Sequence, residues 1–300
     1  MGSVRDRVFA LCATILVGLA GLIVVLVGAV VPVRAAGRLS GDTAGWGAGL
    51  CARPGSGAGQ TGAVRSTDVL TPYVYLSFVT GFNPCAPIPG ESYDVLGVPP
   101  PPTDRPAEEH ADLNLALRGY ELTDAYKGLV DYGGDTDAKA PQLPGLFADD
   151  RVPTFSDVYQ VHHWNWGSNE RGSAIEDPEV TLAGMEVAPG EIVHVPASGY
   201  EIAPGYEVLV LYASAERITL KYTMDDNVVQ GYTLHVENVC VEPSLLALYE
   251  TWNEAGRGYL PALHAGQAFG RARGSEIGVA IRDNGAFMDP RSRKDWWKGR

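Results

Sequence analysis

Apolar and polar residues alternate in five successive runs between residues 179 and 239, with short turn-forming segments between them. The runs are EVTLAGMEV, EIVHV, YEVLVLYA, ERITLKYT and VVQGYTLHV. Because successive side chains of a strand point to opposite faces of a sheet, this period of two is typical of strands with one buried face. Short strands at this spacing predict an antiparallel β-sheet or a barrel-like domain.

The flanking regions add a hairpin and a few helices to this picture. The runs EIGVAIR and AFMD lie on either side of Asn284-Gly285, a dipeptide typical of tight hairpin turns. Helical spacing predicts one helix over residues 103 to 118 and a second over 243 to 256, and the strand-like run LTPYVYLSFVT predicts a strand over 70 to 80. Glycine and proline make residues 131 to 169 loop-rich. The predicted fold class is therefore mostly β with a few short helices.

An apolar segment precedes this domain. Residues 8 to 33 contain no charged side chain, and about 20 apolar residues in a helix cross a hydrocarbon core. We therefore predict one N-terminal transmembrane helix, with the lipid bilayer as its partner and the remaining chain outside the cytoplasm. The small residues at Val33 and Ala35 also suit a signal peptidase, so secretion after cleavage near Ala35 is the alternative.

Composition divides the chain into five segments. They are a membrane anchor or signal segment at 1–36, a Gly-rich flexible spacer at 37–66, a loop-rich α+β subdomain at 67–169, the β-domain at 170–290 and a basic aromatic tail at 291–300. The tail RSRKDWWKGR suits an anionic surface, and packing of its tryptophans on the β-domain is an equal alternative.

Charge and cysteine usage narrow the class of protein. The chain has 36 acidic and 23 basic residues and a net charge of −13, which excludes an extended positive surface for nucleic acid. Cys51 and Cys85 lie in segments of little periodicity, and a disulfide between them is predicted, in line with an oxidising compartment. Cys240 ends an alternating run and is interpreted as a small buried hydrophobic residue.

Four motifs, taken in their order along the chain, resemble the LytM-type domain of the M23 zinc metallopeptidases. They are GEIVHVPASG at 190–199, GYTLHV at 231–236, AGQAFG at 265–270 and EIGVAIRDNGAFMDP at 276–290. The resemblance covers roughly a third of the chain. It implies a β-domain of the kind that uses zinc to cleave peptide cross-bridges in bacterial cell walls.

The zinc ligands of that family have no full counterpart in this chain. The family's HxGxD pair falls on Leu182 and Glu186, and its terminal HxH pair falls on Glu276 and Gly278. Only His235 matches a histidine of the family, whereas zinc catalysis needs three protein ligands and a bound water. The resemblance therefore implies a fold kept and a catalytic site lost, with no catalytic residue, metal or cofactor and with His235 as a remnant. By the same comparison, the helix-like insert 243–256 stands where the family usually has a short turn, and it could cover the old groove.

A noncatalytic binding or regulatory role at the cell envelope is therefore the leading hypothesis. The implied partner is a cell-wall glycan or peptide, or a partner hydrolase. The candidate binding residues are Trp164, Trp166, Glu186, His235 and Glu276. Two alternatives stay open: a zinc-dependent peptidase with an unusual site made of His235, Glu186, Glu276 and His162 or His163, and a purely structural surface protein.

Several of these candidates also have a structural interpretation. A lone histidine in an alternating strand, as His235 is, more often satisfies the sheet than binds a ligand. Trp164 and Trp166 either stack on a sugar ring or fill a seam between subdomains. His194 is expected on the opposite face of its strand. The segment Asp225–Asn227 is interpreted as a solvated turn in preference to a calcium site.

Overall fold

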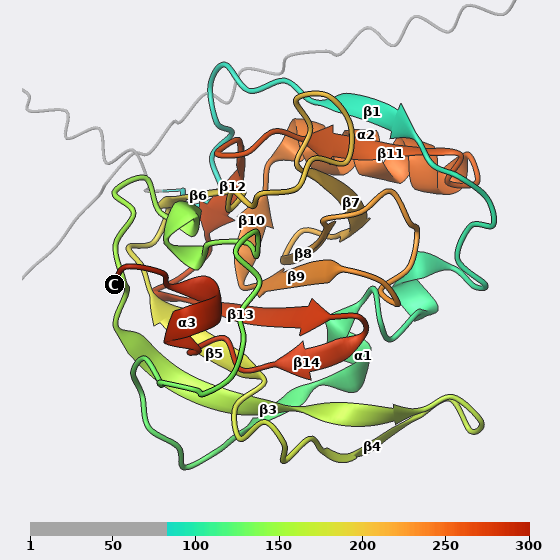
Figure 1. The fold of residues 1–300 in the computed structure, drawn as a ribbon. Coiled ribbons are helices and arrows are strands. Elements are labelled where there is room, and N and C mark those ends of the chain that lie inside the picture. Colours follow the sequence, from blue (N-terminus) through green and yellow to red (C-terminus); the bar gives the residue numbers. More distant parts are fainter. Residues whose placement is uncertain (1–82) are drawn as a thin grey trace, which may run out of the picture. The chain divides into compact units, whose positions relative to one another are not determined.

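The computed structural model describes residues 83–300, and these form a domain of mostly antiparallel β-sheet with a few short helices (Figure 1). The fold class predicted from the alternating runs is confirmed at this level. The strand predicted over residues 70 to 80 and the apolar segment 8–33 lie outside the described residues. Within residues 83–300, no helix is both long and apolar enough to cross a bilayer.

The larger of two sheets has eleven strands. In order across the sheet they are β1 (Asp94–Gly97), β11 (Tyr259–Leu263), β7 (Val208–Ala213), β8 (Arg217–Lys221), β9 (Tyr232–Glu237), β13 (Glu276–Asp283), β5 (Leu182–Glu186), β3 (Phe155–Asn165) and β2 (Tyr120–Leu122), with β14 (Ala286–Met288) on β13 and β4 (Glu170–Ala174) on β3. The smaller sheet has the order β10 (Val239–Val241), β12 (Ala268–Ala272) and β6 (Ile192–His194). Strands from both sides of residue 170 share the larger sheet, because β3 pairs with β5.

The centre of the larger sheet has one apolar and one polar face. Leu220, Leu234 and Ile281 lie on the apolar face, in one hydrophobic core with residues of the smaller sheet. The opposite face, here called the polar face, carries Arg217, Thr219, Lys221, Thr233, His235, Glu237 and Arg282. Most of these polar side chains are buried. A covering segment must therefore supply their hydrogen-bond partners.

Residues 104 to 122 are that covering segment. Thr219 donates to the carbonyl oxygen of Leu113 at 2.7 Å, and Arg282 donates to the carboxylate of Asp112 at 2.8 Å. The single helix predicted over 103 to 118 is wrong: this stretch forms a 3-10 turn η1 (Ala107–Glu109) and a short helix α1 (Leu115–Arg118). Polar groups of residues 104 to 122 contact the sheet, and these tertiary contacts prevent the continuous helix that the spacing of apolar residues predicts.

The helix predicted over residues 243 to 256 is confirmed. Helix α2 (Pro243–Glu254) begins after Glu242, whose side chain accepts from the backbone nitrogen of Ser244 at 2.7 Å. It packs on β11 and β7 (Figure 1). Helix α2 thus lies on strands near one edge of the larger sheet, whereas residues 104 to 122 cover the polar face at its centre.

The region 131 to 169 is less loop-rich than predicted. It contains a second 3-10 turn, η2 (Leu143–Leu146), and the eleven-residue strand β3. The register of β3 against β5 shifts between Phe155 and Val158, and such a bulge interrupts the period of two by which a strand is detected.

The C-terminal segment packs back on the domain. The β13–β14 hairpin turns at Asn284 and Gly285, which both have positive φ as a tight primed turn requires. Helix α3 (Arg293–Trp296) follows, and Trp296 and Trp297 are buried. Their indole nitrogens donate to backbone carbonyls at 2.8 Å. Of the two alternatives for the tail, the structure therefore has the packed one.

The predicted disulfide between Cys51 and Cys85 is wrong, because Cys85 is bonded to Cys240 across 155 residues of chain. Cys240 is buried, as interpreted from the sequence, but it also has the role of a disulfide partner, which that interpretation did not give it. Arg271 on β12, which pairs with Cys240, donates to the carbonyl oxygen of Ala86 at 2.8 Å and holds the two segments together. Because closing so long a loop lowers the conformational entropy of the unfolded chain, the disulfide stabilises the folded state by about 5 kcal/mol in the chain-entropy account.

Candidate functional site

Two of the positions that the resemblance assigns to zinc ligands, Leu182 and Gly278, lie in close apolar packing. Leu182 is fully buried in a cluster with Leu115, Val161 and Ala280. A Cβ added at Gly278 would lie 3.1 Å from Cδ2 of Leu182 and 3.3 Å from Cβ of Glu237. This part of the sheet therefore has no room for an imidazole at position 278, and the residues present do not fit a zinc ion.

Glu186 and Glu276 are direct cross-strand partners on β5 and β13. Both line a broad hollow of about 580 Å³. The carboxylate of Glu276 accepts from the hydroxyl of Ser156 and from that of Tyr159, the latter at 3.1 Å. Burial raises the pKa of Tyr159, and the charge of Glu276 adds to this shift. Two of the predicted binding residues thus share one surface, with Glu276 already bound to two hydroxyl groups.

His235 is a neutral, fully buried member of the polar face. Its Nδ1 lies 3.0 Å from the hydroxyl of Thr219, and that hydroxyl gives its own proton to Leu113. A threonine hydroxyl has one proton, so Nδ1 is the donor to Thr219. The lone pair of Nε2 then has no partner in the described part of the chain. Burial, and next the charge of Arg282, hold the pKa of His235 well below its usual value.

The predicted aromatic residues lie near the tip of the β3–β4 hairpin. The rings of Trp164 and Trp166 are 6.4 Å apart, and Trp166 is 42% exposed. The guanidinium of Arg105 lies 4.9 Å from the ring of Trp166, and His110 contacts the same ring edge-on. Trp166 thus packs against the covering segment, and part of its ring surface faces solvent.

The remaining predicted ligands do not form a metal site. Among residues 83–300, no three His, Cys, Asp or Glu side chains come together in a way that would hold a metal ion. Nδ1 of His162 lies 3.4 Å from the carbonyl oxygen of Arg118 in the covering segment. His163 is exposed. Asp226 lies buried against Arg257 with an oxygen–nitrogen distance of 2.6 Å, so the interpretation of its segment as a solvated turn is wrong for this residue.

A cavity that the sequence did not predict lies where the β8–β9 connection, the β13–β14 turn and two loops meet. We call it the tyrosine–aspartate cavity and define it by Asp137, Tyr200, Tyr222, Tyr232 and Asp283. Its volume is about 390 Å³. Tyr232 and Asp283 are cross-strand partners, whereas Asp137 and Tyr200 come from loops.

The two carboxylates of this cavity have different surroundings. Asp137 accepts from the hydroxyls of Tyr200 at 2.9 Å and Tyr232 at 3.0 Å. Burial opposes ionisation of Asp137, but the backbone N–H of Lys139 and the two hydroxyls outweigh it and lower the pKa. Burial raises the pKa of Asp283, and the nearby charge of Asp137 raises it further. The cavity therefore joins an ionised acceptor and a carboxyl with weakened acidity.

These groups suit a ligand rich in hydroxyl groups. Carboxylates accept hydroxyl protons, the amide of Asn284 both donates and accepts, and tyrosine rings supply apolar surface beside polar tips. A pocket of a few hundred Å³ with a few convergent polar groups is typical of small-molecule sites. The sequence carried no signal for it, because its residues come from segments far apart in the chain.

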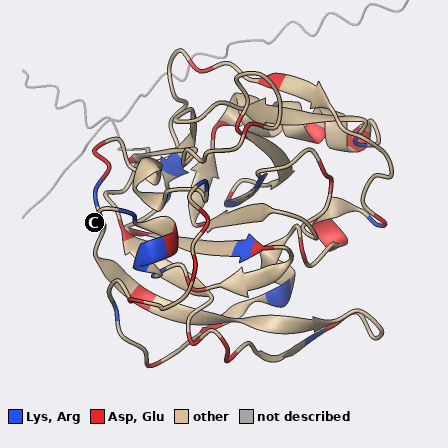
Figure 2. Cartoon of the chain, in the orientation of Figure 1, with Lys and Arg blue, Asp and Glu red and all other residues tan. Residues whose placement is uncertain are grey.

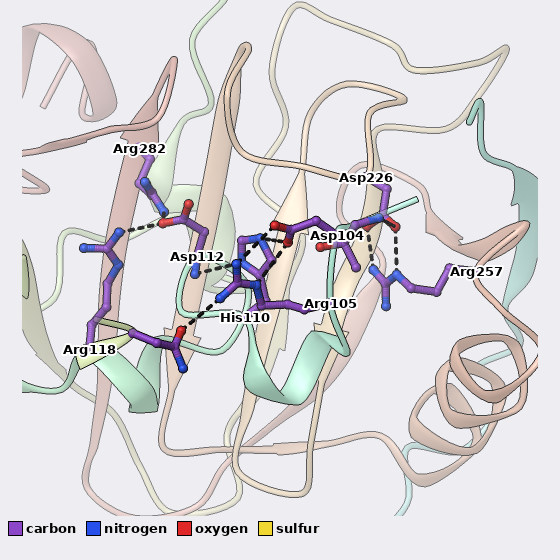
Figure 3. Close-up of polar contacts among 10 residues, drawn as sticks. Asp104, Arg105, His110, Asp112, Arg118, Asp226, Arg257 and Arg282 are labelled. Atoms are coloured by element: carbon purple, nitrogen blue, oxygen red, sulfur yellow. Dashed lines mark hydrogen bonds and ion pairs between the residues drawn. The ribbon is translucent and has the colours of Figure 1, made fainter. Parts of the chain in front are cut away.

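A second polar region lies beneath the covering segment (Figure 3). The guanidinium groups of Arg118 and Arg282 both point towards Asp112 and share its Oδ1 atom, at 2.7 and 2.8 Å. Burial alone would raise the pKa of Asp112, but the two arginine charges lower it. Acidic residues elsewhere in the described chain are mostly spread over loops and element ends (Figure 2).

Comparison with known proteins identifies no relative of this chain. No family model, no curated protein and no solved structure matches it.

Proposed function

We propose that this chain is a membrane-anchored extracytoplasmic protein whose catalytically degenerate, LytM-like β-domain binds a glycan of the cell envelope. The observation that carries the proposal is the tyrosine–aspartate cavity. It presents three tyrosine rings, two carboxylates and an amide around about 390 Å³, a volume in the range of sites for small ligands.

The tyrosine–aspartate contacts favour exchange with a ligand. Tyr200 and Tyr232 donate neutral hydroxyl groups to Asp137, and hydrogen bonds between such groups and those of a ligand have similar strength. A sugar hydroxyl can therefore replace a tyrosine hydroxyl at Asp137 without leaving a buried charge unpaired. Tyr200 is 39% exposed at the rim, so its ring is accessible to the apolar face of a sugar.

Two further features support a noncatalytic role outside the cytoplasm. Leu182 and Gly278 stand where the resemblance requires histidine, and their surroundings are closely packed. The disulfide between Cys85 and Cys240 suits an oxidising compartment. The anchor at residues 8–33 is expected from its uncharged apolar sequence.

The test uses the full chain in detergent micelles and two probes, purified insoluble peptidoglycan in a sedimentation assay and a soluble N-acetylglucosamine tetramer in calorimetry. We expect both to bind, and we expect Tyr200→Ala and Asp137→Asn each to weaken binding about ten-fold. Tyr126→Ala is the matched control, because Tyr126 is also exposed and lies outside the cavity.

Three other outcomes would change or overturn the proposal. Binding of a stem peptide but not of the sugar tetramer would replace the glycan by a peptide ligand. Equal binding by the wild type and both cavity variants would show that the cavity is not the site. Stoichiometric zinc that is lost on replacing Glu186 or Glu276 would restore the peptidase alternative.

A further inference from the structure

The cluster around Asp112 holds one more positive charge than it holds negative charge. Arg118 and Arg282 are 6% and 4% exposed, and the single carboxylate oxygen Oδ1 of Asp112 contacts both. His235, on the adjacent row of the polar face, is neutral. Buried charges are normally paired, so the cluster has the potential to attract a further anion.

Both guanidinium groups keep unused donors. Arg118 donates to Ala111, His162 and Asp112, and Arg282 donates from Nε and both terminal nitrogens to Gly285 and Asp112. Each guanidinium has five N–H groups. Three are used on each side chain, which leaves two N–H groups of each without an acceptor among the described residues.

A cavity of about 250 Å³ opens onto these two arginines, and we call it the arginine cavity. Phe287 forms one wall, with the guanidinium carbons of Arg118 and Arg282 at 5.5 and 4.6 Å from its ring centroid. The aromatic ring holds the two cations side by side. His163 and Ala286 also line the cavity, and the exposed carboxylate of Asp177 is its acidic lining residue.

We propose that the arginine cavity is a binding site for a small oxyanion, a carboxylate or a phosphate group, held between Arg118 and Arg282. Two planar guanidinium groups that present pairs of N–H donors match the oxygen pairs of such groups. The low exposure of both arginines strengthens the contact, because water screens a buried pair less than a surface pair. Asp177 opposes the ligand by its charge and so limits affinity.

The test measures binding of sodium acetate and of inorganic phosphate to the full chain in detergent micelles, by calorimetry and by thermal unfolding. Sodium chloride keeps the ionic strength constant. We expect saturable binding and an increase in Tm with at least one of the two anions. The anion that binds more tightly identifies the source, a carboxylate or a phosphate group.

Two variants at the cavity, each with a surface control, test the location without changing the buried arginines. Ala286→Glu places a carboxylate at the cavity and is expected to weaken anion binding at least ten-fold, whereas Ala255→Glu, an exposed site outside the cavity, leaves it unchanged. Asp177→Asn removes the opposing charge and is expected to strengthen binding about three-fold, whereas Asp124→Asn, with the same change in net charge, has no effect.

The results separate this site from the glycan site. Tyr200→Ala leaves anion binding unchanged if the arginine cavity is the site. Absence of binding by both anions, or equal binding by the wild type and Ala286→Glu, would overturn the proposal.

Discussion

The Asp112 cluster and the tyrosine–aspartate cavity both place carboxylates near the larger sheet, but they surround them with different partners. Asp112 meets two buried arginines, and Asp137 meets two tyrosine hydroxyls. The pKa of both carboxyls is lowered, by cations in one region and by neutral donors in the other. If a carboxylate between buried cations loses these contacts, the cations are left unpaired. A carboxylate that accepts from hydroxyl groups can instead accept from the hydroxyl groups of a ligand. The difference separates a carboxylate that two buried cations fix in place from one whose hydroxyl partners a ligand can replace.

The largest expected effect concerns this contrast directly. Asp112→Asn leaves two buried arginines without their carboxylate, and breaking a buried ion pair on one side costs about 3–5 kcal/mol. Asp137→Asn mainly weakens hydrogen bonds from neutral donors, for which we expect about 1 kcal/mol. Urea unfolding followed by tryptophan fluorescence measures both, with Asp124→Asn as a surface control. Equal losses for the two variants would remove the distinction between the regions.

The next effect is the loss of stability in acid. Burial keeps His235 neutral in the folded protein, but the unfolded chain takes up a proton near pH 6.5. The unfolded state therefore binds more protons as the pH falls, and the free energy of unfolding decreases by up to about 1.4 kcal/mol per pH unit below that value. Asp112 and Asp137 have lowered pKa values and lose their contributions only below about pH 4.

Unfolding experiments at pH 7 and pH 5 test this effect. The wild type is expected to lose about 2 kcal/mol between the two values, and His235→Gln is expected to lose less. His110 and His162 also have lowered pKa values and leave a residual slope in the variant. A wild type and a variant with the same slope would show that His235 does not carry the acid sensitivity.

The central strands were predictable, because β8 and β9 alternate apolar and polar residues without interruption and β7 is a short run of apolar residues. Local pattern failed where tertiary contacts set the conformation. The bulge in β3 broke its period, and the contacts of Asp112 and Leu113 with the sheet replaced a continuous helix by short turns.

The two sites were not predictable for a related reason. Asp137, Tyr200 and Asp283 come from separate turns, and only the sheet topology brings them together. The pairing of Cys85 with Cys240 likewise depends on where the chain before β1 runs along the smaller sheet. The spacing of residues in the sequence predicts neither the cavity nor this disulfide. The sequence already favoured a His235 that satisfies the sheet over one that binds a ligand. No sequence pattern indicated that Arg118 and Arg282 would lie near it.

The smallest effect lies within the tyrosine–aspartate cavity. A carboxyl whose pKa is raised on folding contributes stability at low pH and loses that contribution as the pH rises through its folded pKa. Burial and the charge of Asp137 raise the pKa of Asp283 in this way.

Asp283→Asn is therefore expected to raise the free energy of unfolding slightly at pH 7, by no more than about 0.5 kcal/mol because solvent screens this partly exposed group. The gain becomes smaller as the pH falls to 4, because the raised pKa of Asp283 favours uptake of a proton by the folded wild type. Urea unfolding at the two pH values measures it, and a loss of stability at pH 7 would mean that attraction to Lys221 outweighs repulsion by Asp137, which would bring this cavity closer to the paired arrangement around Asp112.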